Sequence, residues 1–299
     1  MNIAGIFPAL TTPYGEDGSL AIEKFKANLA LYNRTAIAGC VVLGSTGESV
    51  LLSREESEAL LVAAREALPA DKLLIAGTGA ESTAETIART KRAAALGYTV
   101  ALVKTPYYYK PVYKPEVYLR HYRSVADASP IPILLYSVPI FTGVSLETPE
   151  ILDLAEHPNI VGIKDSSGVI QRVVEVAGAA PQEFRVLTGG AAVIYPALCA
   201  GARGAILALA SALPEKCAEV YHLWNSGRHA EAASLQRQLA VASKTVASEN
   251  GIAGLKYAMD LRGYYGGLPR LPLLPVAEEK KRLIAQVIAQ LEPAAVSTT

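Results

Sequence analysis

Lys164 ends the apolar run NIVGIK at residues 159–164, and a lysine in such a place can act as a nucleophile. Burial of an amine disfavours its charged form, and Schiff-base chemistry on a ketone requires the neutral amine. Two ordinary explanations compete with catalysis: an ion pair with Asp165, or a stem that lets the amine reach solvent. Lys104, at the end of YTVALVK, is a second candidate on the same grounds. The residues alone leave this choice open.

Hydroxyl groups follow other apolar runs. Tyr136 ends IPILLY, and a tyrosine beside an amine can shuttle protons, although a packed tyrosine is the ordinary alternative. The stretch GSTGES offers the hydroxyls of Ser45 and Thr46 together with turn N–H groups, which can hold a carboxylate or simply cap the next helix. The aromatic stretch TPYYYKP at 105–111 indicates an interface or a lid over a pocket, with plain packing as the alternative.

Short apolar runs recur along the chain and would position these groups. They are nearly continuous in apolar character, which is typical of parallel strands buried on both faces. The runs are GIFPAL (5–10), AGCVVLG (38–44), KLLIAG (72–77), YTVALV (98–103), IPILLYSV (131–138), NIVGIK (159–164), FRVLTG (184–189) and GAILAL (204–209).

Helical patterns rich in Ala, Leu, Glu and Arg separate these runs. The pattern over 53–69 opens with Ser53 and Glu56, which have the spacing of a capping box. The pattern over 82–97 opens in the same way and closes on Gly97 as a C-cap.

Alternating strands and helices predict a (β/α)8 TIM barrel over residues 1–225, with a helical C-terminal appendage over 226–299. The helical patterns that follow the last strand are one through Trp224 to Ala247, then 252–262 and 276–291. A doubly wound sheet is the runner-up, but it normally carries a glycine fingerprint after its first strand, and GIFPALTTP has none. In a barrel, the ends of the strands form the catalytic face.

Composition excludes several classes of function. The 299 residues carry 28 Lys and Arg against 28 Asp and Glu, which argues against a nucleic-acid or anionic-membrane surface. No stretch reaches the length of a membrane span without a charge, and the N-terminus does not resemble a signal peptide, so we expect a cytoplasmic protein. Cys40, Cys199 and Cys217 each lie in an apolar stretch and are expected to be buried free thiols.

Metal and nucleotide sites are also not expected. The four histidines lie far apart, with no HExxH and no CxxC, so no metal is predicted. GCVVLGST lacks the lysine of a P-loop, and GTGAES lacks the third glycine of a dinucleotide fingerprint. The loops TGGAAV and LALASALP carry little positive charge, which disfavours a sugar-phosphate barrel.

Four motifs in this order, GSTGE, TPYYY, YSVPIFTG and IVGIKDSSG, resemble the dihydrodipicolinate synthase/N-acetylneuraminate lyase family of pyruvate-dependent class I aldolases. The resemblance runs from Gly5 to about Leu291. It implies a TIM barrel that forms a covalent imine through Lys164, without a metal or an organic cofactor. It thereby favours Lys164 over Lys104.

The resemblance also implies roles for other residues. Lys164 would form an imine with pyruvate or a longer 2-oxo acid, and Tyr136 would relay protons. Ser45 stands where the family usually has threonine and would link Tyr136 to Tyr108. Tyr108 is the aromatic that reaches in from a neighbouring subunit in family members. The resemblance therefore implies a homo-oligomer, with a dimer of dimers as the family norm.

The pocket inferred from the resemblance has further members. Ser45 and Thr46 would hold the pyruvate carboxylate, while Gly189 and Ile206 match positions that line the pocket. Phe141 stands where dihydrodipicolinate synthase carries an arginine for the carboxylate of aspartate semialdehyde.

Three stretches, 121–139, 157–168 and 251–267, resemble 4-hydroxy-2-oxoglutarate aldolase, which yields pyruvate and glyoxylate. This cleavage is the reaction we expect first. A dihydrodipicolinate synthase that binds its acceptor without the arginine is the alternative, and an apolar Phe141 also permits the acceptors of hydratase-aldolases. The non-enzymatic alternative is a catalytically silent family member that only binds a 2-oxo acid.

The family's feedback site for lysine is matched poorly. Arg54 and Ser57 stand where histidines are common, and Glu81 stands where an asparagine is common, whereas Glu85 agrees. These differences argue against lysine inhibition and against a role in lysine biosynthesis.

Overall fold

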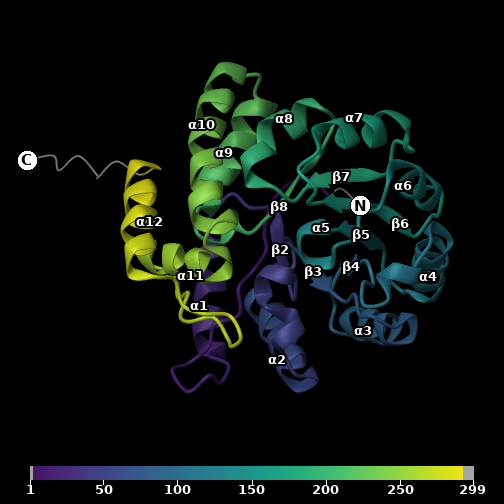
Figure 1. The fold of residues 1–299 in the computed structure, drawn as a ribbon, viewed down its shortest axis with the longest axis horizontal. Coiled ribbons are helices and arrows are strands. Elements are labelled where there is room, and N and C mark those ends of the chain that lie inside the picture. The colour runs from purple at the N-terminus through teal and green to yellow at the C-terminus, as the bar shows by residue number, and fades with distance from the viewer. Residues whose placement is uncertain (1–2, 292–299) are drawn as a thin grey trace, which may run out of the picture.

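Eight parallel strands form the centre of the molecule in a computed structural model that describes residues 3–291 (Figure 1). Each strand coincides with one of the apolar runs. They are β1 (Gly5–Pro8), β2 (Gly39–Val42), β3 (Leu73–Gly77), β4 (Val100–Lys104), β5 (Ile133–Ser137), β6 (Ile160–Asp165), β7 (Arg185–Thr188) and β8 (Gly204–Leu207).

The sheet closes into a barrel. The strand order is β1-β8-β7-β6-β5-β4-β3-β2, and a bridge between Ala9 and Val41 joins the two ends. At this seam the Leu10 N–H donates to the Val41 carbonyl over 2.9 Å, and the Ala38 N–H donates to the Ile6 carbonyl over 2.9 Å. The TIM barrel expected from the sequence is therefore confirmed, and the doubly wound sheet is excluded.

Helices cover the outside of the barrel between the strands (Figure 1). They are α1 (Ile22–Tyr32), α2 (Arg54–Ala67), α3 (Thr83–Ala95), α4 (Pro115–Ala128), α5 (Pro139–Thr142), α6 (Thr148–Ala155), α7 (Ile170–Ala179) and α8 (Ile194–Cys199). The helices after β8 are α9 (Pro214–Asn225), α10 (His229–Ala242), α11 (Gly251–Leu261) and α12 (Glu278–Leu291).

The N-termini of α2 and α3 differ in their caps. At α2 the Ser53 hydroxyl accepts from the Glu56 N–H, and the Glu56 carboxylate accepts from the Ser53 N–H, so the capping box is confirmed. At α3 the Ser82 hydroxyl accepts from the Glu85 N–H over 3.0 Å, but the Glu85 carboxylate binds Arg89 instead. The second predicted box is therefore half formed.

Apolar side chains fill the barrel interior, as its inward-facing layers require. This cluster includes Phe7, Val41, Ile75, Val100, Leu102, Leu134, Leu187 and Ile206. Tyr136 belongs to the same cluster and stands near the carboxyl end of β5. The carboxyl ends of the strands form one mouth of the barrel, and there the apolar interior borders the Tyr136 phenol.

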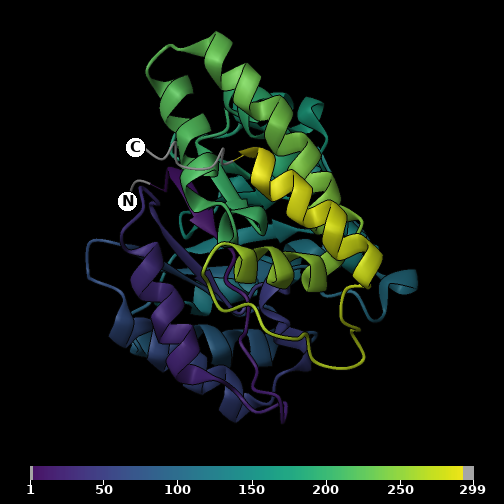
Figure 2. The same ribbon diagram turned by 90° about the vertical axis from the view of Figure 1, so that its left-hand side faces the viewer.

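The C-terminal helices pack along one side of the barrel (Figure 2). The sequence predicts one continuous helix from Trp224 to Ala247, and this prediction is wrong. The chain turns between α9 and α10 at Gly227, whose φ of +73° is the left-handed conformation that glycine adopts most readily. A π-helical turn, Ser243–Ser248, then separates α10 from α11.

A buried ion pair fixes the C-terminal helices to the turn after β2. Lys256 on α11 is fully buried, and its Nζ lies 2.7 Å from Oε1 of Glu48, which is also buried. The backbone N–H of Arg270 donates to Oε2 of Glu48 over 2.8 Å. The guanidinium of Arg270 binds both carboxylate oxygens of Glu56. Glu48 directly follows the 3-10 turn Ser45–Gly47 and has a φ of +55°.

The cysteines differ in burial. Cys40 and Cys217 are buried, and burial raises the pKa of Cys40 to about 12. Cys199 is exposed, which contradicts the prediction of three buried thiols. It is the last residue of α8, whose buried face consists of Ile194, Ala197 and Leu198. Within residues 3–291, none of the helices has the length and apolar character needed to span a membrane.

Candidate active site

Lys164 lies near the carboxyl end of β6 and is 4% exposed. Its Nζ stands 4.1 Å from the centroid of the Tyr136 ring, and the two residues are register partners on β5 and β6. Asp165 points to the opposite face because side chains alternate along a strand. Its carboxylate accepts from the Ser167 N–H over 2.8 Å and lies 3.9 Å from Arg172. The local environment of Lys164 is therefore a tyrosine ring and not an aspartate.

The turn after β2 brings a second hydroxyl to Tyr136. The Ser45 Oγ lies 3.4 Å from the Tyr136 hydroxyl. Within the 3-10 turn, the N–H groups of Gly47 and Glu48 donate back to the carbonyls of Gly44 and Ser45. The N–H groups of Ser45 and Thr46 precede these bonds and are not used by the turn, which suits the binding of a carboxylate.

Tyr108 is not brought to these groups within the single chain, because it is 71% exposed. The Glu81 carboxylate holds its loop by accepting from the N–H groups of Tyr107 and Tyr108 over 2.9 and 2.8 Å. The same carboxylate lies 3.6 Å from the Nζ of Lys104. Sequence reasoning missed this anchoring role, since a glutamate 26 residues before the loop forms no local pattern with it.

The remaining residues named for the pocket differ in their surroundings. A Cβ on Gly189 would lie 1.8 Å from the Ser166 Oγ, so this position has no room for a side chain. Ile206 is fully buried inside the barrel. Phe141 lies on α5 and is 63% exposed, so it stands at the surface.

Two other titratable groups lie near this mouth. Lys104 is the register partner of Tyr136 on β4, and burial lowers the pKa of Lys104 although Glu81 opposes the shift. His121 Nδ1 lies 2.9 Å from the Thr83 hydroxyl, and burial lowers the pKa of His121 to about 4.

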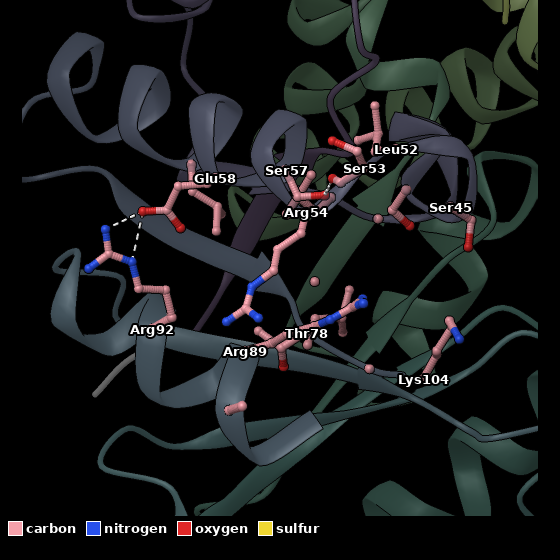
Figure 3. Close-up of a pocket in the computed structure, with 18 of the residues that line it drawn as sticks. Ser45, Leu52, Ser53, Arg54, Ser57, Glu58, Thr78, Arg89, Arg92 and Lys104 are labelled. Carbon is pink, nitrogen blue, oxygen red and sulfur yellow. Dashed lines mark hydrogen bonds and ion pairs between the residues drawn. The ribbon is translucent and has the colours of Figure 1, made fainter. Parts of the chain in front are cut away.

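A cavity of about 370 Å³ opens beside these groups, between α2 and α3 (Figure 3). Ser45, Tyr136 and Lys104 line it together with a set of arginines: Arg54, Arg89 and Arg92. In Figure 3, Ser45 and Lys104 lie at one end of the cavity, and the Arg92–Glu58 ion pair lies at the other. No pattern in the sequence predicts this arginine-lined space, because its arginines come from two helices, α2 and α3.

Within residues 3–291, no three side chains of His, Cys, Asp or Glu gather as a metal site would require. The strand ends bring together an amine (Lys164), a phenol (Tyr136) and a serine hydroxyl (Ser45). Such a set can bind a ketone covalently and move protons beside it.

Comparison with known proteins decides the family. The model of the dihydrodipicolinate synthetase family matches residues 2–291. The chain belongs to this family. A 4-hydroxy-tetrahydrodipicolinate synthase from Exiguobacterium is 36% identical over 287 residues, covering 96% of this chain and 97% of the relative. The dihydrodipicolinate synthase structure from Bacillus anthracis has a TM-score of 0.92 and 27% identity, covering 96% and 98% of the two chains.

A structure described as a monomeric dihydrodipicolinate synthase variant is also similar. It has a TM-score of 0.90 and 28% identity, covering 97% of this chain and 96% of its own. As a member of the dihydrodipicolinate synthetase family, the chain is a lyase and a pyruvate-dependent class I aldolase that acts on small molecules.

Proposed function

We propose that Lys164 forms the imine with pyruvate. Its Nζ adds to the keto carbon, a C–N bond forms, and the keto oxygen leaves as water after taking up protons. The observation that carries this assignment is the placement of a 4%-exposed amine 4.1 Å from the Tyr136 ring.

Tyr136 is the proposed proton carrier. Its hydroxyl would give and take the protons needed to expel water, and would then protonate the aldehyde oxygen when the enamine carbon of pyruvate attacks the aldehyde. In the cleavage direction the same hydroxyl would accept the proton of the substrate hydroxyl while the C–C bond breaks. Ser45, 3.4 Å away, would orient Tyr136, and the turn at Ser45 and Thr46 would hold the carboxylate of pyruvate.

The name of the relatives favours aspartate semialdehyde as the aldehyde, because they are 4-hydroxy-tetrahydrodipicolinate synthases. We therefore place this condensation ahead of the 4-hydroxy-2-oxoglutarate cleavage expected from the sequence. That cleavage is kept as a second candidate because the stretches 121–139, 157–168 and 251–267 resemble 4-hydroxy-2-oxoglutarate aldolase. Phe141, an apolar side chain on α5, cannot pair with the acceptor carboxylate of either reaction. Neither reaction needs a metal or an organic cofactor.

Reduction with borohydride in the presence of pyruvate tests the imine. Intact mass and peptide mapping should show one reduced pyruvyl adduct on Lys164, and none in Lys164→Ala. An adduct on Lys104, or no adduct in the wild type, would overturn the assignment. Incubation with pyruvate and either aspartate semialdehyde or glyoxylate then distinguishes the two candidate reactions by their products.

We also propose that the chain works as a homo-oligomer, for which a dimer of dimers is the family norm. An exposed apolar surface supports this: it consists of Tyr108, Tyr109, Val112, Ile140 and Phe141. These residues come from the loop after β4 and from α5. The loop and the helix are neighbours, because the Lys110 amine donates to the Thr142 carbonyl over 3.4 Å. Apolar patches of this kind mark interfaces. Sedimentation of the wild type as a monomer would contradict the proposal.

A further inference from the structure

The aldehydes of both candidate reactions carry a carboxylate, which needs a cation near the site of C–C bond formation. The helix after β5 offers only the apolar, exposed Ile140 and Phe141 at its outer positions. The cation must therefore come from another part of the mouth.

Lys104 has the required position. Lys104, Tyr136 and Lys164 are successive register partners on β4, β5 and β6. Register partners on neighbouring parallel strands point to the same face, and the strands lie about 4.8 Å apart. The Cα atoms of the two lysines are thus separated by roughly 10 Å, with Tyr136 between them. A short carboxylated aldehyde can span part of this gap while its carbonyl oxygen stays beside Tyr136.

The contacts of Lys104 leave it able to bind a ligand. Its side chain is 15% exposed and lines the 370 Å³ cavity together with Ser45 and Tyr136. Within residues 3–291, its acidic partner is Glu81, whose Oε1 lies 3.6 Å from the Lys104 Nζ, which is longer than a charge-assisted hydrogen bond of about 2.8 Å. The other Glu81 oxygen is occupied by the N–H groups of Tyr107 and Tyr108. Glu81 therefore favours the charged amine without occupying its hydrogen-bonding positions.

The other cations of the cavity are less suited to this role. Arg92 is bound by Glu58, and Arg89 is bound by Glu85 over 2.8 Å. Arg54 projects into the middle of the cavity in Figure 3, farther along from Ser45 than Lys104 is. Lys104 is the cavity cation that adjoins Tyr136 in the register of the strands.

We propose that Lys104 binds the carboxylate of the aldehyde acceptor and so determines which aldehydes react. The inference rests on the proposed function of Lys164 and Tyr136. It assigns to the second strand-end lysine a binding role and leaves the nucleophilic role to the first.

Lys104→Met removes the charge while retaining an unbranched side chain, and Lys104→Arg retains the charge. Lys91→Met is the matched control, because Lys91 is exposed on α3 and lies outside the cavity. At saturating pyruvate, we measure the KM of whichever of aspartate semialdehyde and glyoxylate the wild type consumes. Loss of one charge-assisted hydrogen bond raises this KM by roughly ten- to a hundredfold in Lys104→Met. Lys104→Arg should recover most of the loss, and Lys91→Met should match the wild type.

Borohydride trapping separates this inference from the proposed function. The pyruvate concentration that gives half-maximal trapping should stay within about threefold of the wild type in Lys104→Met. A residue that binds only the acceptor leaves imine formation intact. An unchanged acceptor KM, or equal losses in trapping and in acceptor KM, overturns the inference. Failure of the wild type itself to trap pyruvate overturns the proposed function instead.

Discussion

Replacement of Lys256 by methionine tests the fully buried ion pair between Lys256 and Glu48. Methionine has a similar length and no charge, so it fills the space beneath Tyr14 but gives Glu48 no counter-ion. The Lys256 amine lies 2.7 Å from Oε1 of Glu48, donates to the Leu268 carbonyl over 2.9 Å, and stands 4.6 Å from the centroid of the Tyr14 ring. All of these contacts are lost together.

The expected loss of unfolding free energy is about 3–5 kcal/mol, the range for a buried pair that loses one partner. Both side chains of the pair have no exposure to solvent, so water cannot replace the amine around Glu48. The Arg270 N–H at 2.8 Å still reaches Oε2, which is why a larger loss is not expected. Removing the carboxylate charge as well should restore part of the stability. The free energy of unfolding should therefore be higher in the double variant Glu48→Gln/Lys256→Met than in Lys256→Met alone.

Urea unfolding followed by circular dichroism measures these differences at pH 7. Lys26→Met is the control, because Lys26 also forms an ion pair, at 2.9 Å from Glu66, but at the surface. That pair should contribute little, since exposed ion pairs are screened by solvent. If Lys256→Met loses no more stability than Lys26→Met, or if the double variant is less stable than Lys256→Met, the reasoning about the buried charge is refuted.

Two further predictions concern a histidine and a serine. Burial holds the pKa of His121 at about 4 against an ordinary value of 6.5, so only the unfolded chain binds this proton as the pH falls between those values. Stability should therefore decrease by about 3 kcal/mol from pH 6.5 to 4, and His121→Gln, measured by urea unfolding at several pH values, should show a weaker decrease. An identical pH dependence in both proteins would contradict this. Ser45→Ala should lower kcat roughly tenfold by leaving the Tyr136 hydroxyl unoriented, while Ser45→Thr should retain most of it. Steady-state kinetics decide the point, and a full kcat in Ser45→Ala would show that Tyr136 does not depend on Ser45.

The sequence predicts those features that short-range patterns determine. Each strand is an apolar run bounded by helical patterns, and the barrel topology then brings Lys164 and Tyr136 to one mouth. The break at Gly227 was missed because the apolar spacing continues on both sides of it. The exposure of Cys199 was missed because an apolar neighbourhood in sequence does not specify which face of a short helix is buried.

Contacts between distant parts of the chain were also beyond the sequence. Glu48 looks like one more polar residue in a glycine-containing turn, and Lys256 like one charge in an amphipathic helix. Their burial together depends on how α11 packs against the barrel. No periodic pattern encodes that contact, and the same holds for Glu81 and the N–H groups of its aromatic loop.

The partners of Glu48 also set an order of events during folding. Arg270 stands 222 residues after Glu48, so a nascent chain completes the first seven strands long before either Lys256 or Arg270 has left the ribosome. Until then the carboxylate of Glu48 has no internal counter-ion and must stay hydrated, which keeps the Ser45–Gly47 turn open to water. Long-range contacts of this kind form late and slowly. The turn after β2, the proposed site for the pyruvate carboxylate, is therefore completed only when Lys256 and Arg270 have packed against Glu48.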